Sequence, residues 1–361
     1  MIVTFVILAA VLLAFANGAN DNFKGFATVW GSATLSYRRA LIIATVAALA
    51  GSLVSVLVAH GLVKQFSGKG LVPDDVLALP AFALAVATGA AAAVLIATRV
   101  GLPISTTHAL VGGLVGAGLA ASAAGVDFGK LGTAFFLPLL LSPVLSAAIG
   151  YSVYRLMPKR NAEKDCICVV APTPQMAGDG TMARTATMPE VIIDTDQACA
   201  VHGDEAHRGS VNNVLDGAHI ASAATICFAR SLNDTPKLAG LMVVVAAGNA
   251  NLSLAAIALA MAIGGLVLSR RVAETMSQKI TPLEPAQGLV ANVTTALLVL
   301  LASFKGLPVS TTHVSVGAIS GVGAGANTLS GSTLRNILLS WVGTLPLAAA
   351  IAWVVMTVAR G

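Results

Sequence analysis

Gly306-Leu-Pro-Val-Ser-Thr-Thr-His313 is the stretch on which the fold depends, because it occurs twice: Gly101-Leu-Pro-Ile-Ser-Thr-Thr-His108 differs from it at one position. Long apolar runs flank both copies, which places both at or within a membrane. We expect Pro103 and Pro308 to lie in the first turn of a helix, where a backbone N–H has no partner to lose. The hydroxyls and N–H groups that follow lie at the positive end of that helix and predict an anion site. The alternative, that Ser and Thr only cap or link helices, is weakened by the duplication.

The composition predicts an all-α polytopic membrane protein. Of 361 residues, 56% are hydrophobic and only 10% are charged, whereas a soluble domain carries roughly 25% charged residues. The net charge of +5 calls for no nucleic-acid partner, because no basic patch is interleaved with aromatic residues. The first apolar run, residues 2–16, has no basic region before it and no cleavage site after it, so we interpret it as a retained helix.

Apolar segments long enough to cross a bilayer form two sets of five. We predict about 10–12 membrane segments. Two of the helices should be interrupted, near Gly18–Asn22 and near Ser231–Pro236. The stretches that begin at the two motif prolines could alternatively form re-entrant hairpins. The predicted organisation is a first membrane repeat at 1–157, a polar loop at 158–211, and a second membrane repeat at 212–361. The expected spans are 2–36, 40–60, 79–98, 103–124, 131–156, 212–248, 250–269, 286–304, 306–325 and 335–359.

The two halves match in order, and their basic residues predict an orientation. Each half opens with an interrupted segment that carries Asn-Asp and later reaches Ser-Thr-Thr-His; five crossings per half make the two repeats inverted. With both termini outside the cell and the 158–211 loop in the cytoplasm, 13 basic residues fall in inner loops and 5 in outer loops. The inner set is Arg38, Arg39, Arg99, Arg155, Lys159, Arg160, Lys164, Arg184, Arg208, Arg270, Arg271, Lys279 and Arg335. The outer set is Lys64, Lys69, Lys130, Lys305 and Arg360.

Asp21 and Asp234 are acids at membrane depth. A charge in the hydrocarbon costs at least ~2.5–3.5 kcal/mol on insertion scales, so such a residue usually belongs to a substrate or ion path. Each follows an Asn at a break, where unwound carbonyls can also coordinate a cation. The alternative is a capping pair at the start of the next half-helix, and both interpretations can hold together.

These elements resemble the inorganic phosphate transporter (PiT) family. The likeness rests on the two Asn-Asp segments, the twin Pro-[Ile/Val]-Ser-Thr-Thr-His motifs, and the stretch Lys279-Ile-Thr-Pro-Leu-Glu-Pro-Ala-Gln287. It covers both membrane halves and implies two inverted repeats that take up phosphate with a coupling ion at the cell (inner) membrane. It further implies phosphate ligands at Ser105, Thr106, Thr107, Ser310, Thr311 and Thr312, and ion sites lined by Asn20, Asp21, Asn233 and Asp234.

Two lysines depart from the pattern that the resemblance implies. Sodium-coupled members of that family typically carry Asn-Asp-Val-Ala-Asn-Ala, whereas this chain has Lys24 and Lys237 at the position of the later Asn. Each lysine follows its Asp by three residues, so on a helix its ammonium can reach the carboxylate. An amine there takes the place of a bound cation, so we expect proton coupling, with sodium as the alternative. The competing interpretation is that both lysines snorkel to an interface.

The function predicted is secondary active symport of inorganic phosphate, with sulfate or another tetrahedral oxyanion as the alternative substrate. An intramembrane hydrolase is disfavoured, because an enzyme needs one nucleophile and the constellation appears twice, so we predict no enzyme activity and no cofactor. His108 and His313 could relay a proton, although a packing role is at least as consistent with the sequence. The polar loop carries Cys166, Cys168, Cys199, His202 and His207, which are metal-ligand types, but their spacing fits no standard zinc pattern and we assign no metal site. Possible homo-oligomerisation is left open.

Overall fold

A computed structural model describes residues 2–58, 66, 68–122, 125–158, 165–170, 175–176, 182–183, 190–201, 207–242 and 250–360. The chain forms two compact units. Met1–Arg155 and Ile220–Gly361 together make the membrane unit, and Leu156–His219 makes the inserted unit. Six residues named in the predictions lie outside the described residues: Lys64, Lys159, Arg160, Lys164, Arg184 and His202.

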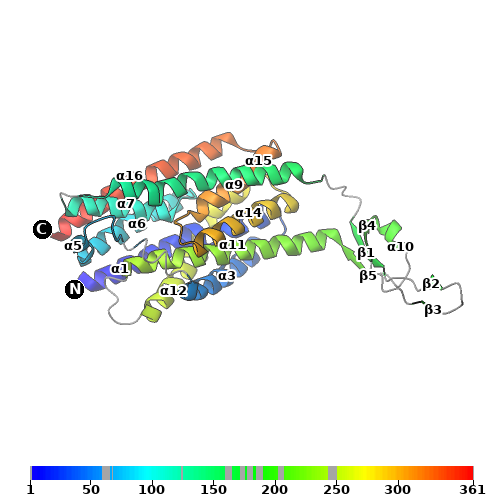
Figure 1. Cartoon of the computed structure of the whole chain (residues 1–361), viewed down its shortest axis with the longest axis horizontal. Helices are drawn as coiled ribbons and strands as arrows, with labels where there is room; N and C mark the ends of the chain where they lie inside the picture. Colours follow the sequence, from blue (N-terminus) through cyan, green and yellow to red (C-terminus); the bar gives the residue numbers. More distant parts are fainter. Residues whose placement is uncertain are drawn as a thin grey trace. The chain divides into compact units, whose positions relative to one another are not determined.

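The membrane unit consists of helices that hold most of the apolar sequence (Figure 1). Its first half contains α1 (Ile2–Asp21), η1 (Lys24–Phe26), α2 (Ala27–Gly31), α3 (Tyr37–Val58), α5 (Asp74–Leu77), α6 (Pro80–Val100), α7 (Thr106–Ala121), α8 (Phe128–Leu131), the π-helical turn η2 (Gly132–Phe136) and α9 (Leu137–Leu156). Its second half contains α11 (Val211–Met242, which starts in the inserted unit), α12 (Ala250–Leu268), α13 (Arg270–Glu274), the π-helical turn η3 (Thr275–Lys279), α14 (Pro285–Phe304), α15 (Thr311–Gly325) and α16 (Gly331–Arg360).

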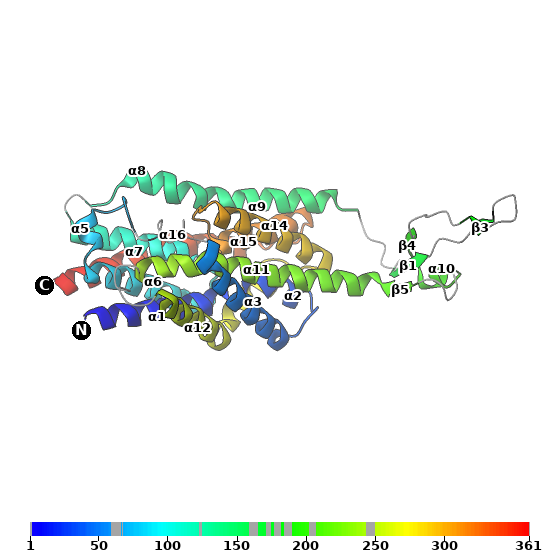
Figure 2. The ribbon, with the colours of Figure 1, turned by 60° about the horizontal axis from the view of Figure 1, so that its bottom comes forward.

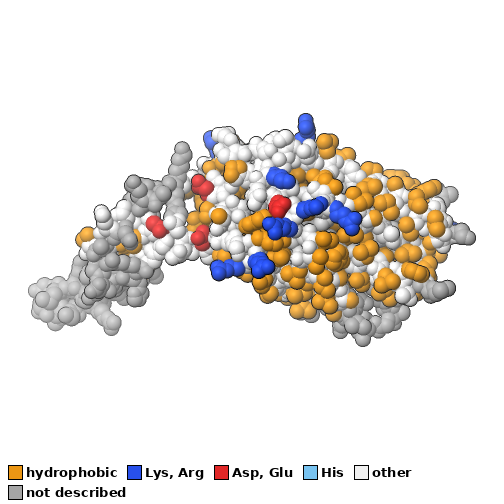
Figure 3. Space-filling model, turned by 180° about the vertical axis from the view of Figure 1, so that it is seen from behind, with side chains coloured by type: hydrophobic (Ala, Val, Ile, Leu, Met, Phe, Trp, Pro, Cys, Tyr) orange, Lys and Arg blue, Asp and Glu red, His pale blue; other side chains and the backbone are white. Residues whose placement is uncertain are grey.

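The helices confirm a multi-spanning, all-helical membrane fold. Among the described residues, six helices are long and apolar enough to cross a bilayer, or seven when the pair Leu254–Leu268 and Arg270–Lys279, bent by 66°, counts as one span. This is fewer than the ten or more segments expected, in part because α7 and α15 have only 16 and 15 residues. On the face seen in Figure 3, hydrophobic side chains cover much of the membrane unit, and Lys and Arg gather in one part of it.

The two expected interruptions turn out differently. In the first half, α1 ends at Asp21 and a turn with η1 precedes α2, so that interruption is confirmed. In the second half the expectation was wrong, because α11 continues through Ser231–Pro236 without a break. A proline removes only one backbone donor, and neighbouring helices in a membrane bundle can accommodate it within a helix.

Each hydroxyl motif is an extended segment that leads into a short helix. Gly101 and Gly306 have positive φ values of 83° and 65° and end α6 and α14 in the left-handed conformation that glycine adopts without strain. The following residues are extended, and α7 and α15 begin only after Ser105 and Ser310. The placement of the prolines in a first helical turn was therefore wrong, because serine, with a side chain that accepts a backbone hydrogen bond, is the N-cap of each helix.

Close helix packing brings these segments together. α1 packs against α6 and α12, while α6 and α7 pack against α16 and α14 packs against α15. At the α1–α12 crossing, a Cβ on Gly18 would collide with the carbonyl of Met261, so only glycine permits this approach. The start of α1 and the end of α16 lie at the same end of the unit (Figures 1 and 2).

The inserted unit is a small antiparallel fold. Its three-stranded sheet has the order β4-β1-β5, formed by β1 (Cys166–Val170), β4 (Glu190–Asp194) and β5 (His207–Ser210). A two-residue pair, β2 (Gln175–Met176) and β3 (Met182–Ala183), and helix α10 (Asp196–Ala200) complete it. β1 and β4 are rich in β-branched residues at 167–170 and 191–193, which favour strands.

Candidate binding site between the two halves

Five charged side chains are buried together inside the membrane unit. Asp21 and Lys24 come from the end of α1 and from η1, and Arg230, Asp234 and Lys237 come from α11. None of the five residues is more than 3% exposed. We call these five residues the charged cluster. The N-terminal ends of α7 and α15 complete its surroundings.

Lys24 joins its own half to the other. It forms an ion pair with Asp21 and donates hydrogen bonds to Asn20 Oδ1 at 2.8 Å and to the Ile104 carbonyl at 2.9 Å. A further hydrogen bond, of 2.6 Å, runs from Lys24 Nζ to Thr312 Oγ1 in the second motif. The Thr312 hydroxyl is also 2.8 Å from the Ile104 carbonyl, to which it donates.

Lys237 repeats this arrangement from the other side. It lies 3.0 Å from Asp234 Oδ1 and donates to the Val309 carbonyl at 2.9 Å and to Thr107 Oγ1 at 3.0 Å. Its ammonium also lies 5.7 Å from the centroid of the Phe66 ring. Each lysine thus binds one carbonyl of its own motif and a threonine hydroxyl of the opposite motif. The expected Lys–Asp contacts are confirmed, and because both lysines are buried, the snorkelling interpretation is wrong.

Arg230 and Asn17 connect the two acids. Arg230 Nη1 donates to Asn17 Oδ1 at 3.2 Å and lies 3.7 Å from Asp234 Oδ2. The Asn17 amide nitrogen lies 3.3 Å from Asp21 Oδ2, 3.4 Å from Asp234 Oδ2 and 3.0 Å from Thr106 Oγ1. Asn17 was not among the predicted site residues. It could have been found from spacing, because it precedes Asp21 by four residues as Arg230 precedes Asp234.

Asn20 and Asn233 hold the chain that leads into the motifs. Asn20 Nδ2 donates to Thr98 Oγ1 at 2.9 Å and to the Leu102 carbonyl at 3.1 Å, and Asn20 Oδ1 accepts from the Ile104 N–H at 3.1 Å. Asn233 Nδ2 donates to Ser303 Oγ at 2.8 Å. Thr98 and Ser303 each precede their motif proline by five residues, a second repeated spacing that sequence reasoning missed.

The six motif hydroxyls have different partners. Ser105 Oγ and Ser310 Oγ accept from the backbone N–H groups of the two motif histidines, at 3.1 and 3.2 Å, and act as N-caps. The Thr106 hydroxyl donates to Asp21 Oδ2 at 3.3 Å, and Thr311 is buried. Thr107 and Thr312 accept from the lysines. Both helix N-termini, which carry N–H groups without intrahelical partners, therefore point toward the charged cluster.

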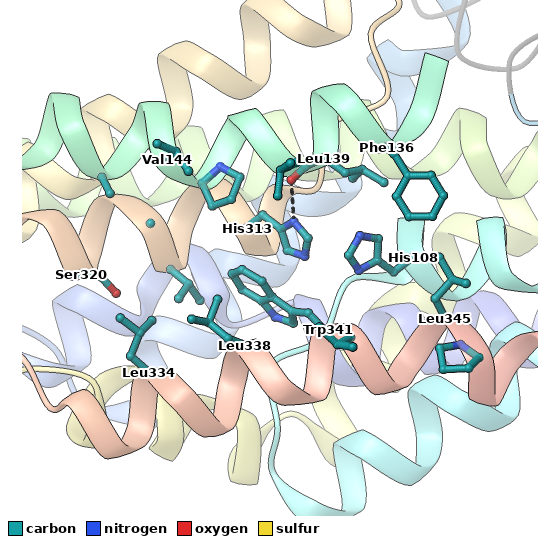
Figure 4. Close-up of a pocket in the computed structure, with 17 residues that line it drawn as sticks. His108, Phe136, Leu139, Val144, His313, Ser320, Leu334, Leu338, Trp341 and Leu345 are labelled. Atoms are coloured by element: carbon teal, nitrogen blue, oxygen red, sulfur yellow. Dashed lines mark hydrogen bonds between the residues drawn. The ribbon is translucent and has the colours of Figure 1, made fainter. Parts of the chain in front are cut away.

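An apolar cavity of about 660 Å³ lies beside the motifs (Figure 4). His108 and His313 line it with their rings edge to face, 4.5 Å apart between centroids. His313 Nδ1 is 3.1 Å from the Leu139 carbonyl, and its ring stacks on Trp341, whose indole N–H donates to the Pro103 carbonyl at 3.0 Å. The two histidines thus belong to an aromatic packing cluster that supports the extended segment before α7.

The charged cluster suits an anion. With all five side chains ionised, three cations face two carboxylates, which leaves one unit of positive charge in a buried site. An unbalanced buried charge is costly, and a monovalent anion would neutralise it. The threonine hydroxyls and the helix N-termini offer the hydrogen-bond donors and the positive potential that a tetrahedral oxyanion accepts.

Comparison with known proteins gives a consistent result. The sequence profile of the phosphate transporter family matches residues 17–352. The chain is 29% identical to "Putative phosphate permease" of Haemophilus influenzae, over 96% of this chain and 94% of that one, and 28% identical to "Inorganic phosphate transporter 2-1, chloroplastic" of Arabidopsis thaliana, over 96% and 70%. A solved structure titled "The sodium-dependent phosphate transporter" superposes with a TM-score of 0.78 at 26% identity, covering 99% of each chain.

Proposed function

Because the chain belongs to the phosphate transporter family, we propose that it carries inorganic phosphate across the membrane as a proton-coupled symporter whose substrate site is the charged cluster with the two hydroxyl motifs. The observation that carries this proposal is the crossed contact of each buried lysine with the threonine of the opposite motif. These contacts join both halves at one point in the membrane unit.

The existing hydrogen bonds indicate how phosphate would be held. Lys24 and Lys237 now donate to Thr312 and Thr107, and a phosphate oxygen is a stronger, charged acceptor for the same ammonium groups. The Thr107 hydroxyl, which here accepts from Lys237, can donate its proton to the anion, whereas the Thr312 proton is already donated to the Ile104 carbonyl. Arg230 provides a third cation, so the phosphate would exchange water for charge-assisted hydrogen bonds from both halves.

The lysines favour protons over sodium as the coupling ion. A lysine ammonium has three donors and no lone pair to offer a metal ion, and here each ammonium is paired with the carboxylate that would otherwise attract a cation. A divalent phosphate would leave one excess negative charge in the site, which one proton taken up with it would cancel. The neighbouring solved structure is of a sodium-dependent protein; this chain would differ from it in that respect.

Contacts at the membrane unit's surface support the proposed orientation. Arg271 donates to the Arg99 carbonyl, and both residues belong to the basic set assigned to the cytoplasmic side. Lys130 donates to the Lys69 carbonyl, and both belong to the outer set. We therefore keep two inverted repeats with both termini outside and the inserted unit in the cytoplasm as part of the proposal.

Uptake of radiolabelled phosphate into proteoliposomes tests the proposal. At fixed pH, we expect uptake to persist when choline replaces sodium. It should also resist excess sulfate, because only phosphate can donate hydrogen bonds to the carboxylates. In a separate experiment, uptake should rise when the outer solution alone is made acidic. Strict sodium dependence without a response to the pH gradient would overturn proton coupling. Absence of phosphate uptake under every gradient would overturn the transport function itself.

A further inference from the structure

Three cysteine sulfurs meet in the inserted unit, apart from the transport site. The Sγ atoms of Cys166, Cys168 and Cys199 all lie within 4.8 Å of one another, and the three residues are at most 4% exposed. Cys168 and Cys199 form a disulfide with a Cα–Cα distance of 5.8 Å. Cys166 contributes the third sulfur. A transport function for the membrane unit does not account for this cluster.

The small fold explains why the sulfurs converge. Cys166 and Cys168 are two residues apart in β1, so their side chains lie on the same face of the sheet. Strand β4 pairs with β1 over its whole length and leads directly into α10, which packs over β1. The Thr195 hydroxyl caps α10 by accepting the Ala198 N–H at 3.2 Å, and this turn carries Cys199 to the cysteine face of β1. Ile192, which lies opposite Cys168 in the sheet, packs against this cluster and helps to exclude water.

We propose that, in the reduced protein, these three thiolates bind one soft cation of the class of Zn²⁺ or Cu⁺. Thiolates are the preferred ligands of such ions, and the cytoplasmic side, where the orientation above places this unit, keeps thiols reduced. Two equivalents of a small cellular thiol supply two electrons and two protons to the Cys168–Cys199 disulfide, and leave as one disulfide of the reductant. Coordination of the cation by all three sulfurs then releases three protons.

The metal-binding strand is hydrogen-bonded to the start of α11, so metal binding would also affect this part of the inserted unit. Asp165, directly before Cys166, accepts from the Asn212 N–H at 2.9 Å and from the Ser210 hydroxyl at 3.0 Å, while its carbonyl accepts from the Val211 N–H at 2.8 Å. The strand that carries two of the ligands is therefore hydrogen-bonded to the first residues of α11. Occupancy would stabilise this junction. The disulfide of the same small thiol, acting as the two-electron oxidant, would re-form Cys168–Cys199, leave as two thiols and release the ion.

The test uses purified full-length protein, reduced with a phosphine that is then removed. Zn²⁺ and Cu⁺ are offered separately, and Cd²⁺ serves as the spectroscopic substitute for Zn²⁺. We expect one equivalent of metal to remain after dialysis, with a cadmium–thiolate charge-transfer band. We expect metal affinity to fall by at least about 100-fold in each of three variants, Cys166→Ser, Cys168→Ser and Cys199→Ser. Removing an outer-shell partner of a metal ligand costs up to about 100-fold, and loss of a direct ligand should cost at least as much. Cys227→Ser, a buried cysteine of the membrane unit, is the matched control and should bind like the wild type.

Two further measurements separate loss of a ligand from loss of the fold. Oxidised Cys166→Ser should still form the Cys168–Cys199 disulfide, counted by alkylation and mass spectrometry. The oxidised wild type should release the metal, a readout that needs no substitution. The proposal is overturned if the reduced wild type retains no more metal than the triple serine variant, if reduced Cys166→Ser binds as tightly as the wild type, or if oxidation leaves binding unchanged.

Discussion

The two Asn-Asp segments reach the same contacts from different backbones. In the first half, Asp21 ends α1 and Lys24 lies in the 3-10 turn that follows; in the second, Asp234 and Lys237 lie within the uninterrupted helix α11. Both lysines nevertheless bind their aspartate, one carbonyl of their own motif, and the threonine of the opposite motif. The spacing of three residues brings amine and carboxylate together in either kind of turn.

The halves differ in charge at the position four residues before each aspartate. Asn17 occupies it in the first half and Arg230 in the second, and the two side chains are hydrogen-bonded to each other. Asp234 therefore lies near two cations, whereas Asp21 forms an ion pair with Lys24 alone among the described residues. This asymmetry provides the one uncompensated positive charge of the cluster, so we assign anion affinity mainly to the second half.

Removing the lysines should have the largest effect on stability and should distinguish the two halves. Lys24→Met leaves Asp21 as a buried charge without its ion-pair partner, and we expect a loss of about 3–5 kcal/mol in the free energy of unfolding. Lys237→Met should cost less, because Arg230 remains 3.7 Å from Asp234. Unfolding in detergent measures both. Lys24→Met combined with Asp21→Asn should recover part of the loss, and equal losses in the two single variants would contradict the asymmetry.

Neutralising Arg230 should abolish the charge difference between the halves. Truncating one partner of a buried charge pair costs about 2–5 kcal/mol. Because about 1.4 kcal/mol corresponds to a factor of ten, we expect Arg230→Gln to raise the apparent KM for phosphate by at least roughly 30-fold. Uptake at varied phosphate concentration measures this. Arg270→Gln, which removes an exposed cation paired with Glu274, serves as the control. A normal KM for Arg230→Gln would show that the extra charge does not face the substrate.

The motif threonines should reveal how equivalent the halves are. Thr107→Val and Thr312→Val each remove one hydrogen bond to a buried ammonium, worth about 1.5–3 kcal/mol. We expect each to reduce uptake roughly 10- to 150-fold, with losses of similar size because each threonine accepts from one buried lysine. Thr225→Val, at an exposed position on α11, controls for loss of a helical hydroxyl. Near-normal uptake in both motif variants would exclude these hydroxyls from the site.

The motif serines should show the smallest effect. Ser105 and Ser310 cap α7 and α15 in the same way, so Ser105→Ala and Ser310→Ala should each lower the free energy of unfolding by about 0.5–2 kcal/mol. The apparent KM for phosphate should stay within a factor of about three of the wild type, because these hydroxyls contact the backbone at the helix start and no side chain of the charged cluster. A large rise in KM with unchanged stability would show that the two serines bind phosphate and do not act as caps.

Several features could be predicted because they depend on composition or short spacing. The apolar runs require a membrane environment, and the duplicated motif identifies two corresponding halves whatever their packing. The Lys–Asp pairs follow from three-residue spacing, and the strands around Cys168 and Ile192 follow from their β-branched residues. The position of the motif prolines was predicted wrongly, because serine and proline compete to start a helix and the local sequence does not decide between them.

Contacts between residues far apart in the chain depend on the tertiary fold. Lys24 and Thr312 are 288 residues apart, and Asn17 and Arg230 are 213 apart; no periodicity relates them. The continuity of α11 through Pro236 likewise depends on its neighbours in the bundle. Cys199 joins the other two cysteines only because β4 and α10 fold back over β1. Local spacing determines which groups on one turn can meet, whereas helix and strand packing determines which turns lie side by side.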